Sequence, residues 1–146
     1  PGGPPIWLAG SVPATIERVG RHFDGWFPNG PSPQDYAATW AQMQAVARDA
    51  GRDPGALTGA AYLTLAVDED AARAQARMDA FLATYYGQRP DVMRKKQACY
   101  AGPLAGAREW LGAFVAAGAS HLVLRFAGDQ ERHMDLLAGI GATLAR

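Results

Sequence analysis

A short turn near the start of the chain combines the residue types that bind an anion. Gly10 and Ser11 lie between an apolar run and a segment of helical periodicity that begins near Pro13. Backbone N–H groups at the start of a helix lack intrahelical partners and lie at the positive end of its dipole, so they attract phosphate. Because Pro13 has no N–H, we expect the donors to be the backbone of Gly10, Ser11, Val12 and Ala14, with the Ser11 hydroxyl. The alternative on physical grounds is an ordinary N-cap by Ser11.

Arg125 is a second residue whose position points to binding. It lies near the carboxyl end of the apolar run His121–Phe126, which has the length and composition of a strand. A charge within such a strand needs a partner, and a ligand phosphate or carboxylate would serve. A salt bridge at the rim of the fold would serve equally well, so both interpretations stay open. His121, at the other end of the run, is interpreted as structural.

Other residue types that support catalysis do not form a group in the sequence. No cluster of His, Cys, Asp and Glu has the spacing of a metal site, so we expect no metal. His22 and His133 fall on helical segments without a second ligand, and we predict that they lie at the surface or rim. Ser11 has no histidine nearby in the sequence that would complete a hydrolase triad. Cys99, the one cysteine, is interpreted as a structural thiol.

These candidates depend on four units in which a short apolar run precedes a segment of helical periodicity, which predicts parallel strands and outer helices. The segment 90–100 is less regular, and we predict a short helix there within a longer connection. An open flavodoxin-like sheet would need a fifth strand, for which we find no segment. A whole (β/α)8 barrel needs about 250 residues, so the 146 residues of this chain suffice for half of one. The four runs are Ile6–Ala9, Gly25–Phe27, Ala60–Val67 and His121–Phe126.

Three stretches resemble the luciferase-like monooxygenase family. PIWLAGSVPA (Pro5–Ala14) is similar to the fifth strand and following turn of that family, DGWF (Asp24–Phe27) to its sixth strand, and AGASHLVLRF (Ala117–Phe126) to its eighth. The resemblance implies an α/β fold of four parallel β/α units that form the C-terminal half of a TIM-type (β/α)8 barrel. It also implies one domain over residues 1–146, from which the family's first four strands are absent.

The same resemblance implies a flavin-dependent oxidoreductase or monooxygenase that uses reduced FMN or the deazaflavin F420 on a small organic substrate. Cofactor phosphates or the neighbouring ring bind at this turn in the family, which favours Ala9, Gly10, Ser11 and Val12 as cofactor-binding residues, and we add Arg125. Much of the family's acid/base machinery belongs to the absent half, so no catalytic residue is assigned, and we expect this half alone to be inactive. The alternative is a non-catalytic half-barrel module that binds a phosphorylated ligand or serves as an interaction subunit.

Composition and chain ends suggest the partners and the compartment. Fourteen Lys and Arg balance fourteen Asp and Glu without a basic stripe, so we expect no nucleic-acid partner. No apolar run approaches the ~20 residues of a membrane helix, and the lone Cys99 suits a reducing cytoplasm. Four parallel strands leave two unpaired edges, from which we expect self-association or pairing with a missing N-terminal half. The opening Pro1–Pro5, which does not start with Met, is interpreted as a linker or the tail of a preceding segment.

Overall fold

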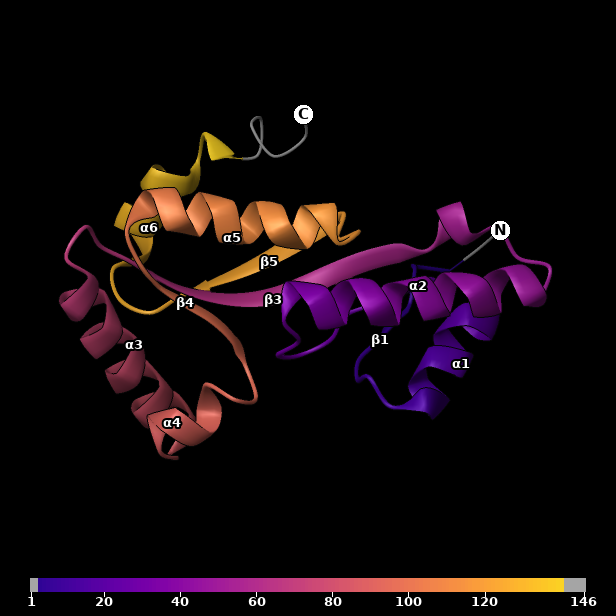
Figure 1. Cartoon of the computed structure of the whole chain (residues 1–146), viewed down its shortest axis with the longest axis horizontal. Coiled ribbons are helices and arrows are strands. Elements are labelled where there is room, and N and C mark those ends of the chain that lie inside the picture. Colours follow the sequence, from indigo (N-terminus) through magenta and orange to yellow (C-terminus); the bar gives the residue numbers. More distant parts are fainter. Residues whose placement is uncertain (1–2, 141–146) are drawn as a thin grey trace.

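The computed structural model describes residues 3–140, which form a five-stranded parallel sheet with helices on both faces (Figure 1). Pro1 and Gly2 of the opening run lie outside the described residues. None of the helices in this part of the chain is long and apolar enough to cross a membrane. In chain order the elements are β1 (Trp7–Leu8), α1 (Pro13–His22), β2 (Gly25–Trp26), α2 (Pro33–Asp49), η1 (Pro54–Ala56), β3 (Thr58–Val67), α3 (Ala71–Tyr86), α4 (Pro90–Met93), β4 (Ala98–Gly102), α5 (Leu104–Ala116), β5 (His121–Phe126) and α6 (Gln130–Leu137).

The long strand β3 is the one on which the rest of the sheet is built. Its first two residues pair with β2, its last five (Leu63–Val67) pair with β4, and Ala60–Leu65 pair with β5. β4 and β5 both pair with Leu63–Leu65, so they occupy opposite edges of β3. Successive backbone groups alternate between the edges: Thr58 N donates to Asp24 O beside β2, and Gly59 O accepts from Ser120 N beside β5. β2 and β4 therefore lie end to end along one edge, and β5 occupies the other.

β4 corrects the sequence prediction for the segment 90–100. The expected short helix is present as α4, but Ala98–Gly102 forms a strand where an irregular connection was predicted. The two residues of β2 cannot cover the edge of the ten-residue β3, and β4 pairs with the part that β2 leaves open. Its sequence, ACYAG, is short and rich in small residues, so its composition does not indicate a strand. This fifth strand extends the line of β2 and does not take the outer position that a flavodoxin-like sheet would give it.

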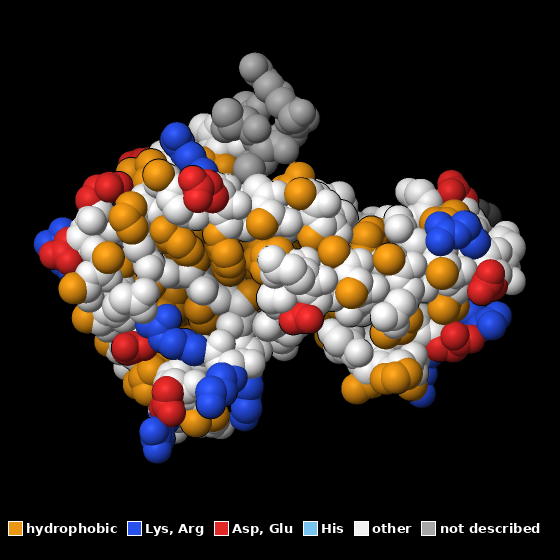
Figure 2. Space-filling view, viewed as in Figure 1, with side chains coloured by type: hydrophobic (Ala, Val, Ile, Leu, Met, Phe, Trp, Pro, Cys, Tyr) orange, Lys and Arg blue, Asp and Glu red, His pale blue; other side chains and the backbone are white. Residues whose placement is uncertain are grey.

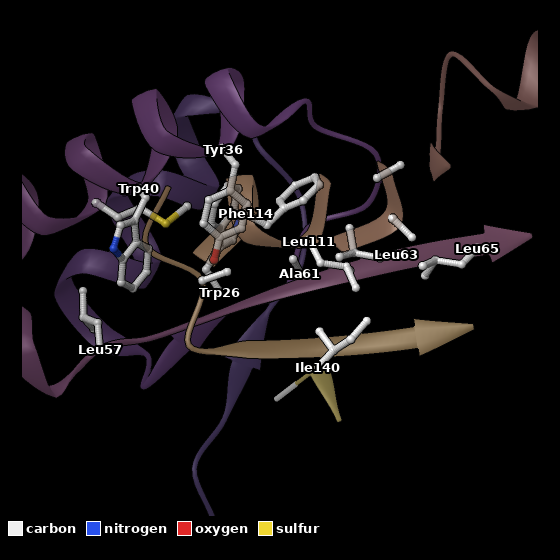
Figure 3. Packing of buried hydrophobic residues seen from close by; sticks show 14 of the residues in the cluster. Trp26, Tyr36, Trp40, Leu57, Ala61, Leu63, Leu65, Leu111, Phe114 and Ile140 are labelled. Carbon is white, nitrogen blue, oxygen red and sulfur yellow. The ribbon is translucent and has the colours of Figure 1, made fainter. Parts of the chain in front are cut away.

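The main hydrophobic core lies between one face of the sheet and helices α1, α2, α5 and α6 (Figure 3). Side chains alternate across β3, and Leu63 and Leu65 face this core. Trp26 of β2 is fully buried here, with its ring 4.7 Å from Tyr36 and stacked at 6.5 Å on Trp40. Burial of these large rings stabilises this part of the fold, because each removes a large apolar area from water.

The opposite face of the sheet is covered only in part. Ala66, near the carboxyl end of β3, packs against Ala74 and Met78 of α3 in a second, smaller cluster. Figure 1 shows α3 and α4 on the side of the sheet away from α5. Further from this cluster no described helix covers the sheet, and Val123 of β5 is 38% exposed. This face is therefore open enough to receive a ligand or another segment of protein.

Candidate functional site

The predicted anion-binding turn, residues 9–12, is an exposed connection between β1 and α1 at the carboxyl end of the strand. Gly10 has a φ of 97°, a conformation that residues with a side chain rarely adopt. Its carbonyl oxygen accepts a hydrogen bond of 2.6 Å from Nε1 of Trp26 on the neighbouring strand. The buried indole thus anchors the turn to the core.

Backbone donors of this turn remain available. Within residues 3–140, the N–H groups of Gly10, Ser11 and Val12 donate no hydrogen bond, whereas the Val12 carbonyl accepts from Thr15 and Ile16. Val12 is the N-cap residue, and no side chain caps the helix, so the interpretation of Ser11 as an ordinary N-cap is wrong. Because the helix is capped at Val12 and not at Ser11, the extended turn is one residue longer. The free N–H groups of the turn lie at the positive end of the α1 dipole.

Arg125 lies on the other face of β5 from the main core. It is in register with Thr64 of β3, and its Nε and Nη2 donate to Thr64 Oγ1 at 3.2 and 2.8 Å. Nη2 also donates to the Tyr86 hydroxyl at 2.8 Å. The salt bridge that one interpretation required is absent, because no carboxylate of the described residues lies within ion-pair distance.

Four aromatic rings surround the Arg125 guanidinium, and we call them the aromatic cage: Tyr62, Phe81, Tyr85 and Tyr86. The central carbon of the guanidinium, Cζ, lies 4.8 Å from the ring centre of Tyr85 and at most 5.3 Å from the ring centres of the other three residues. Such distances stabilise a cation through the negative faces of the rings. Burial lowers the pKa of Arg125, but the hydrogen bond to Tyr86 and the interactions with Tyr62 outweigh it and raise the pKa overall. The cage therefore holds a permanently charged group.

A row of aromatic side chains extends across this face from β1 to the cage. The ring centres of Trp7 and Phe27 lie 6.5 Å apart, and those of Phe27 and Tyr62 lie 5.5 Å apart. The Tyr62 ring centre in turn lies 4.9 Å from Cζ of Arg125. The turn and Arg125 themselves lie on β1 and β5, with β2 and β3 between them. Among the described residues no direct contact joins the turn to Arg125, so they are two separate candidate binding points.

The family model of luciferase-like monooxygenases matches residues 1–144. The chain belongs to this family. A 5,10-methylenetetrahydromethanopterin reductase of Methanolobus tindarius is 32% identical to it over 95 residues, which are 65% of this chain and 29% of that protein. An F420-dependent hydroxymycolic acid dehydrogenase of Mycobacterium tuberculosis is 40% identical over 73 residues, which are 50% of this chain and 20% of that protein.

Solved structures of family-like enzymes confirm the predicted half of a TIM-type barrel. An F420-dependent secondary alcohol dehydrogenase in complex with an F420–acetone adduct gives a TM-score of 0.79 at 17% identity, covering 99% of this chain and 50% of that chain. A long-chain alkane monooxygenase gives 0.72 at 16% identity, covering 97% and 41%. At such identities the likeness shows the fold alone. The chain spans half or less of the length of these proteins.

The barrel architecture of the family assigns the two faces of the sheet. Helices lie outside a TIM-type barrel, so the face under α1, α2, α5 and α6 is the outer face. The face that carries Tyr62 and Arg125 is the inner one, and the carboxyl ends of the strands form the end where such barrels bind ligands. The connection from β3 to α5 is extended by α3, α4 and β4, and α3 covers the inner face at that end.

The aromatic cage was not predicted from the sequence. The helical stripe of α3 contains Ala74, Met78, Phe81 and Tyr85, which is typical of a core, and only the first two of these are fully buried. Tyr85 is instead 61% exposed. An available signal was the cluster of three aromatic residues within six positions at the end of one helix, together with an arginine in a strand.

His133 does not lie at the surface or rim as predicted, because it is fully buried. Its Nε2 accepts from the backbone N–H of Val67 at 2.9 Å, and its Nδ1 donates to the carbonyl of Asp129. The ring also stacks on Phe126 at 5.2 Å. Both nitrogens are thus used, and the histidine joins α6 to the end of β3 as a structural residue. His22 is exposed, as predicted.

Two further titratable groups near the carboxyl ends of the strands, Asp68 and Cys99, are interpreted as structural residues. Asp68 is buried and accepts from Arg73, from Arg77 at 2.9 Å and from the backbone N–H of Asp70. The hydrogen bond from Arg73 is the main reason that its pKa is held far below the usual range. Burial raises the pKa of the half-buried Cys99 thiol, so it is a poor nucleophile. No group of three or more metal-ligating side chains occurs between residues 3 and 140.

Proposed function

We propose that this chain is the C-terminal part of an F420- or FMN-dependent oxidoreductase, and that residues 9–12 bind the cofactor phosphate. The supporting observation is the set of N–H groups at Gly10, Ser11 and Val12, which have no acceptor within the described residues and precede α1. Glycine at position 10 also leaves space, since a Cβ there would lie 3.3 Å from Thr15 Oγ1 and the φ of 97° would be strained.

The chain would bind and orient the reactants, while bound F420 or FMN would supply hydride or oxygen chemistry. The backbone N–H groups of Gly10, Ser11 and Val12 would donate hydrogen bonds to the phosphate. The Ser11 hydroxyl would add a further donor, and the backbone of Ala9 would line the site. Arg125 offers a second, cationic contact on the inner face. Asp68 holds no exchangeable proton near neutrality, because its pKa is lowered and its oxygens are occupied by Arg73 and Arg77. No proton-transfer residue is assigned to this part of the fold.

Titration of the chain with F420 and with FMN, followed by cofactor fluorescence, tests the phosphate site and identifies the cofactor. Ser11→Ala removes one charge-assisted donor and is expected to weaken binding about tenfold. Gly10→Ala is expected to weaken it at least as much. Gly51→Ala is the matched control, because Gly51 also has a positive φ, 71°, with no atom within 4 Å of an added Cβ. Unchanged affinity in both turn variants would refute the phosphate assignment.

We also propose that the inner face is covered in the active protein, either by the strands of an N-terminal half or by a second copy. The outer edge of β5 is unpaired among the described strands, and Trp7 and Val123 lie on the uncovered face. Light scattering at high concentration tests self-association, which a monodisperse monomer with a cooperative melt would exclude. Adding the N-terminal half of a family barrel then tests pairing.

Turnover separates the enzyme from the alternative of a non-catalytic binding module. With the complete barrel and reduced cofactor, we expect oxidation or reduction of a small organic substrate. Cofactor binding without turnover in that assembly would favour the module. We propose a cytoplasmic location because the single thiol, Cys99, is suited to a reducing compartment.

A further inference from the structure

The close hydrogen bonds of Arg125 to described residues involve only Nε and Nη2, and Tyr85 adds a weaker interaction with the guanidinium. Nε and one N–H of Nη2 donate to Thr64 Oγ1, and the other N–H of Nη2 serves the Tyr86 hydroxyl. A guanidinium has five N–H groups, two of them on Nη1. Within residues 3–140, none of these close hydrogen bonds involves Nη1. An oxygen bound at Nη1 would leave the hydrogen bonds to Thr64 and Tyr86 in place.

The charge of Arg125 is paired with no carboxylate within residues 3–140, and two other partly buried arginines show the alternatives. Arg94 pairs with Asp79 at 2.8 Å. Arg52 donates to three backbone carbonyls at 2.7 to 3.0 Å, at the end of α1. Arg125 instead meets the hydroxyl groups of Thr64, Tyr86 and Tyr85 and four ring faces, and none of these carries a formal negative charge. An anion would thus find a cation that is already oriented and has no carboxylate to release.

The aromatic cage supplies apolar surface beside the guanidinium. Phe81 and Tyr85 stack at 5.4 Å with an angle of 19° between their planes, and Tyr85 is 61% exposed. A stacked pair with one exposed ring, Tyr85, next to a cation provides contact area for a flat or apolar molecule. Figure 2 shows hydrophobic side chains between α5 and the α3–α4 segment, and Lys and Arg side chains around α4.

We propose that Arg125 and the aromatic cage bind an oxygen anion carried on a planar or apolar body, the chemistry of an aromatic carboxylate. The organic substrate or the cofactor can present such an oxygen. The inference rests on the proposed function, since it names the class of molecule that the same inner face recognises. The oxygen accepts from Nη1, and the body lies against the exposed rings of α3.

The test is a titration of the isotope-labelled full chain with benzoate, followed by the NMR signals of the arginine side chains and of the backbone around β5 and α3. Arg125→Met is expected to weaken benzoate binding about tenfold or more, through loss of a charge-assisted hydrogen bond. Tyr85→Ala is expected to weaken it several-fold and keeps the test open if the first variant unfolds. Arg108→Met, at an exposed position of α5, is the control and should bind benzoate as the wild type does.

Titrations with acetate, benzamide and FMN distinguish whether the bound oxygen anion belongs to the substrate or to the cofactor. Acetate lacks the planar body and benzamide lacks the charge, so both should bind more weakly than benzoate. Loss of benzoate binding alone in Arg125→Met supports a substrate carboxylate, and loss of FMN binding supports a cofactor oxygen. If Arg125→Met changes neither, or if benzamide binds as well as benzoate, the inference is wrong. Gly10→Ala should impair FMN and leave benzoate unaffected, so failure of the phosphate site is distinguishable from failure of the cage.

Discussion

Trp26 and Trp7 lie on adjacent strands and face opposite sides of the sheet. Trp7 pairs with Gly25, so Trp26 is one position further along and projects the other way. On the outer face Trp26 is fully buried and its Nε1 donates to Gly10. On the inner face Trp7 is half-buried against Phe27, and its Nε1 has no acceptor among the described residues. The outer face is thus the more completely packed of the two, although the buried Tyr36 hydroxyl there also has no hydrogen-bond partner among the described residues.

Two half-buried arginines repeat this contrast. Arg52 donates to the carbonyls of Val19, Gly20 and Phe23 and so completes the end of α1. Arg125, on the inner face, makes its close hydrogen bonds within the described chain through Nε and Nη2 alone. The first arrangement satisfies backbone groups that would otherwise be unpaired, and the second leaves Nη1 outside these bonds. The same residue type is therefore structural on one face and available for binding on the other.

The largest expected effect comes from truncation on the outer face. Trp26→Ala removes a fully buried ring and should lower the free energy of unfolding by about 3–5 kcal/mol. Trp7→Ala should cost less than half of that, because Trp7 is only half-buried. Urea denaturation of both variants checks the comparison. Equal losses would show that the inner face is packed as tightly as the outer one.

His133 tests whether a buried polar contact stabilises the outer face. His133→Phe leaves the Val67 N–H without an acceptor and should cost about 1–3 kcal/mol. His133→Gln places an amide oxygen near the position of Nε2 and should recover part of that loss. Thermal melts of the two variants give the measurement. A phenylalanine variant as stable as the glutamine variant would contradict the role of this hydrogen bond.

Asp68 should make stability depend on acid pH. Its folded pKa lies below the unfolded value of about 3.9, chiefly through the hydrogen bond from Arg73. The stabilisation is therefore present above the unfolded pKa and is lost as the pH falls through the folded one. Urea midpoints at about pH 6 and about pH 3 should differ more in the wild type than in Asp68→Asn. The same pH dependence in both proteins would assign the acid sensitivity to other carboxylates.

The two arginines give the smallest difference in stability. Arg52→Met should lower the free energy of unfolding by about 1–2 kcal/mol, because it leaves helix-end carbonyls unpaired. Arg125→Met should change it by about 1 kcal/mol or less, since only hydroxyl and ring contacts are lost. Chemical denaturation of both variants is the check. A greater loss for Arg125→Met would mean that the cage serves folding more than binding.

Much of the architecture could be predicted from local pattern. The apolar runs at Ile6–Ala9, Gly25–Phe27, Ala60–Val67 and His121–Phe126 each overlap a strand of the structure, although β3 begins two residues earlier, at Thr58, and the alternation with helices correctly indicates parallel pairing. β4 was missed because its pairing depends on the edge of β3 that β2 leaves free, which is a long-range property. The burial of His133 was missed for the same reason, since its partner Val67 is 66 positions away.

The candidate site likewise contains one part that local sequence predicted and one part that depends on long-range contacts. Local sequence was enough to predict an exposed glycine turn before α1, and its role in binding the cofactor phosphate remains a prediction. The sequence also marked Arg125 as a charge that needs a partner. Only the tertiary structure decided that this partner is Thr64, Tyr86 and a ring of aromatic side chains. The physical reason is that turns and periodicity are set by neighbouring residues, whereas a cage forms where a strand, its pairing partner and a distant helix meet.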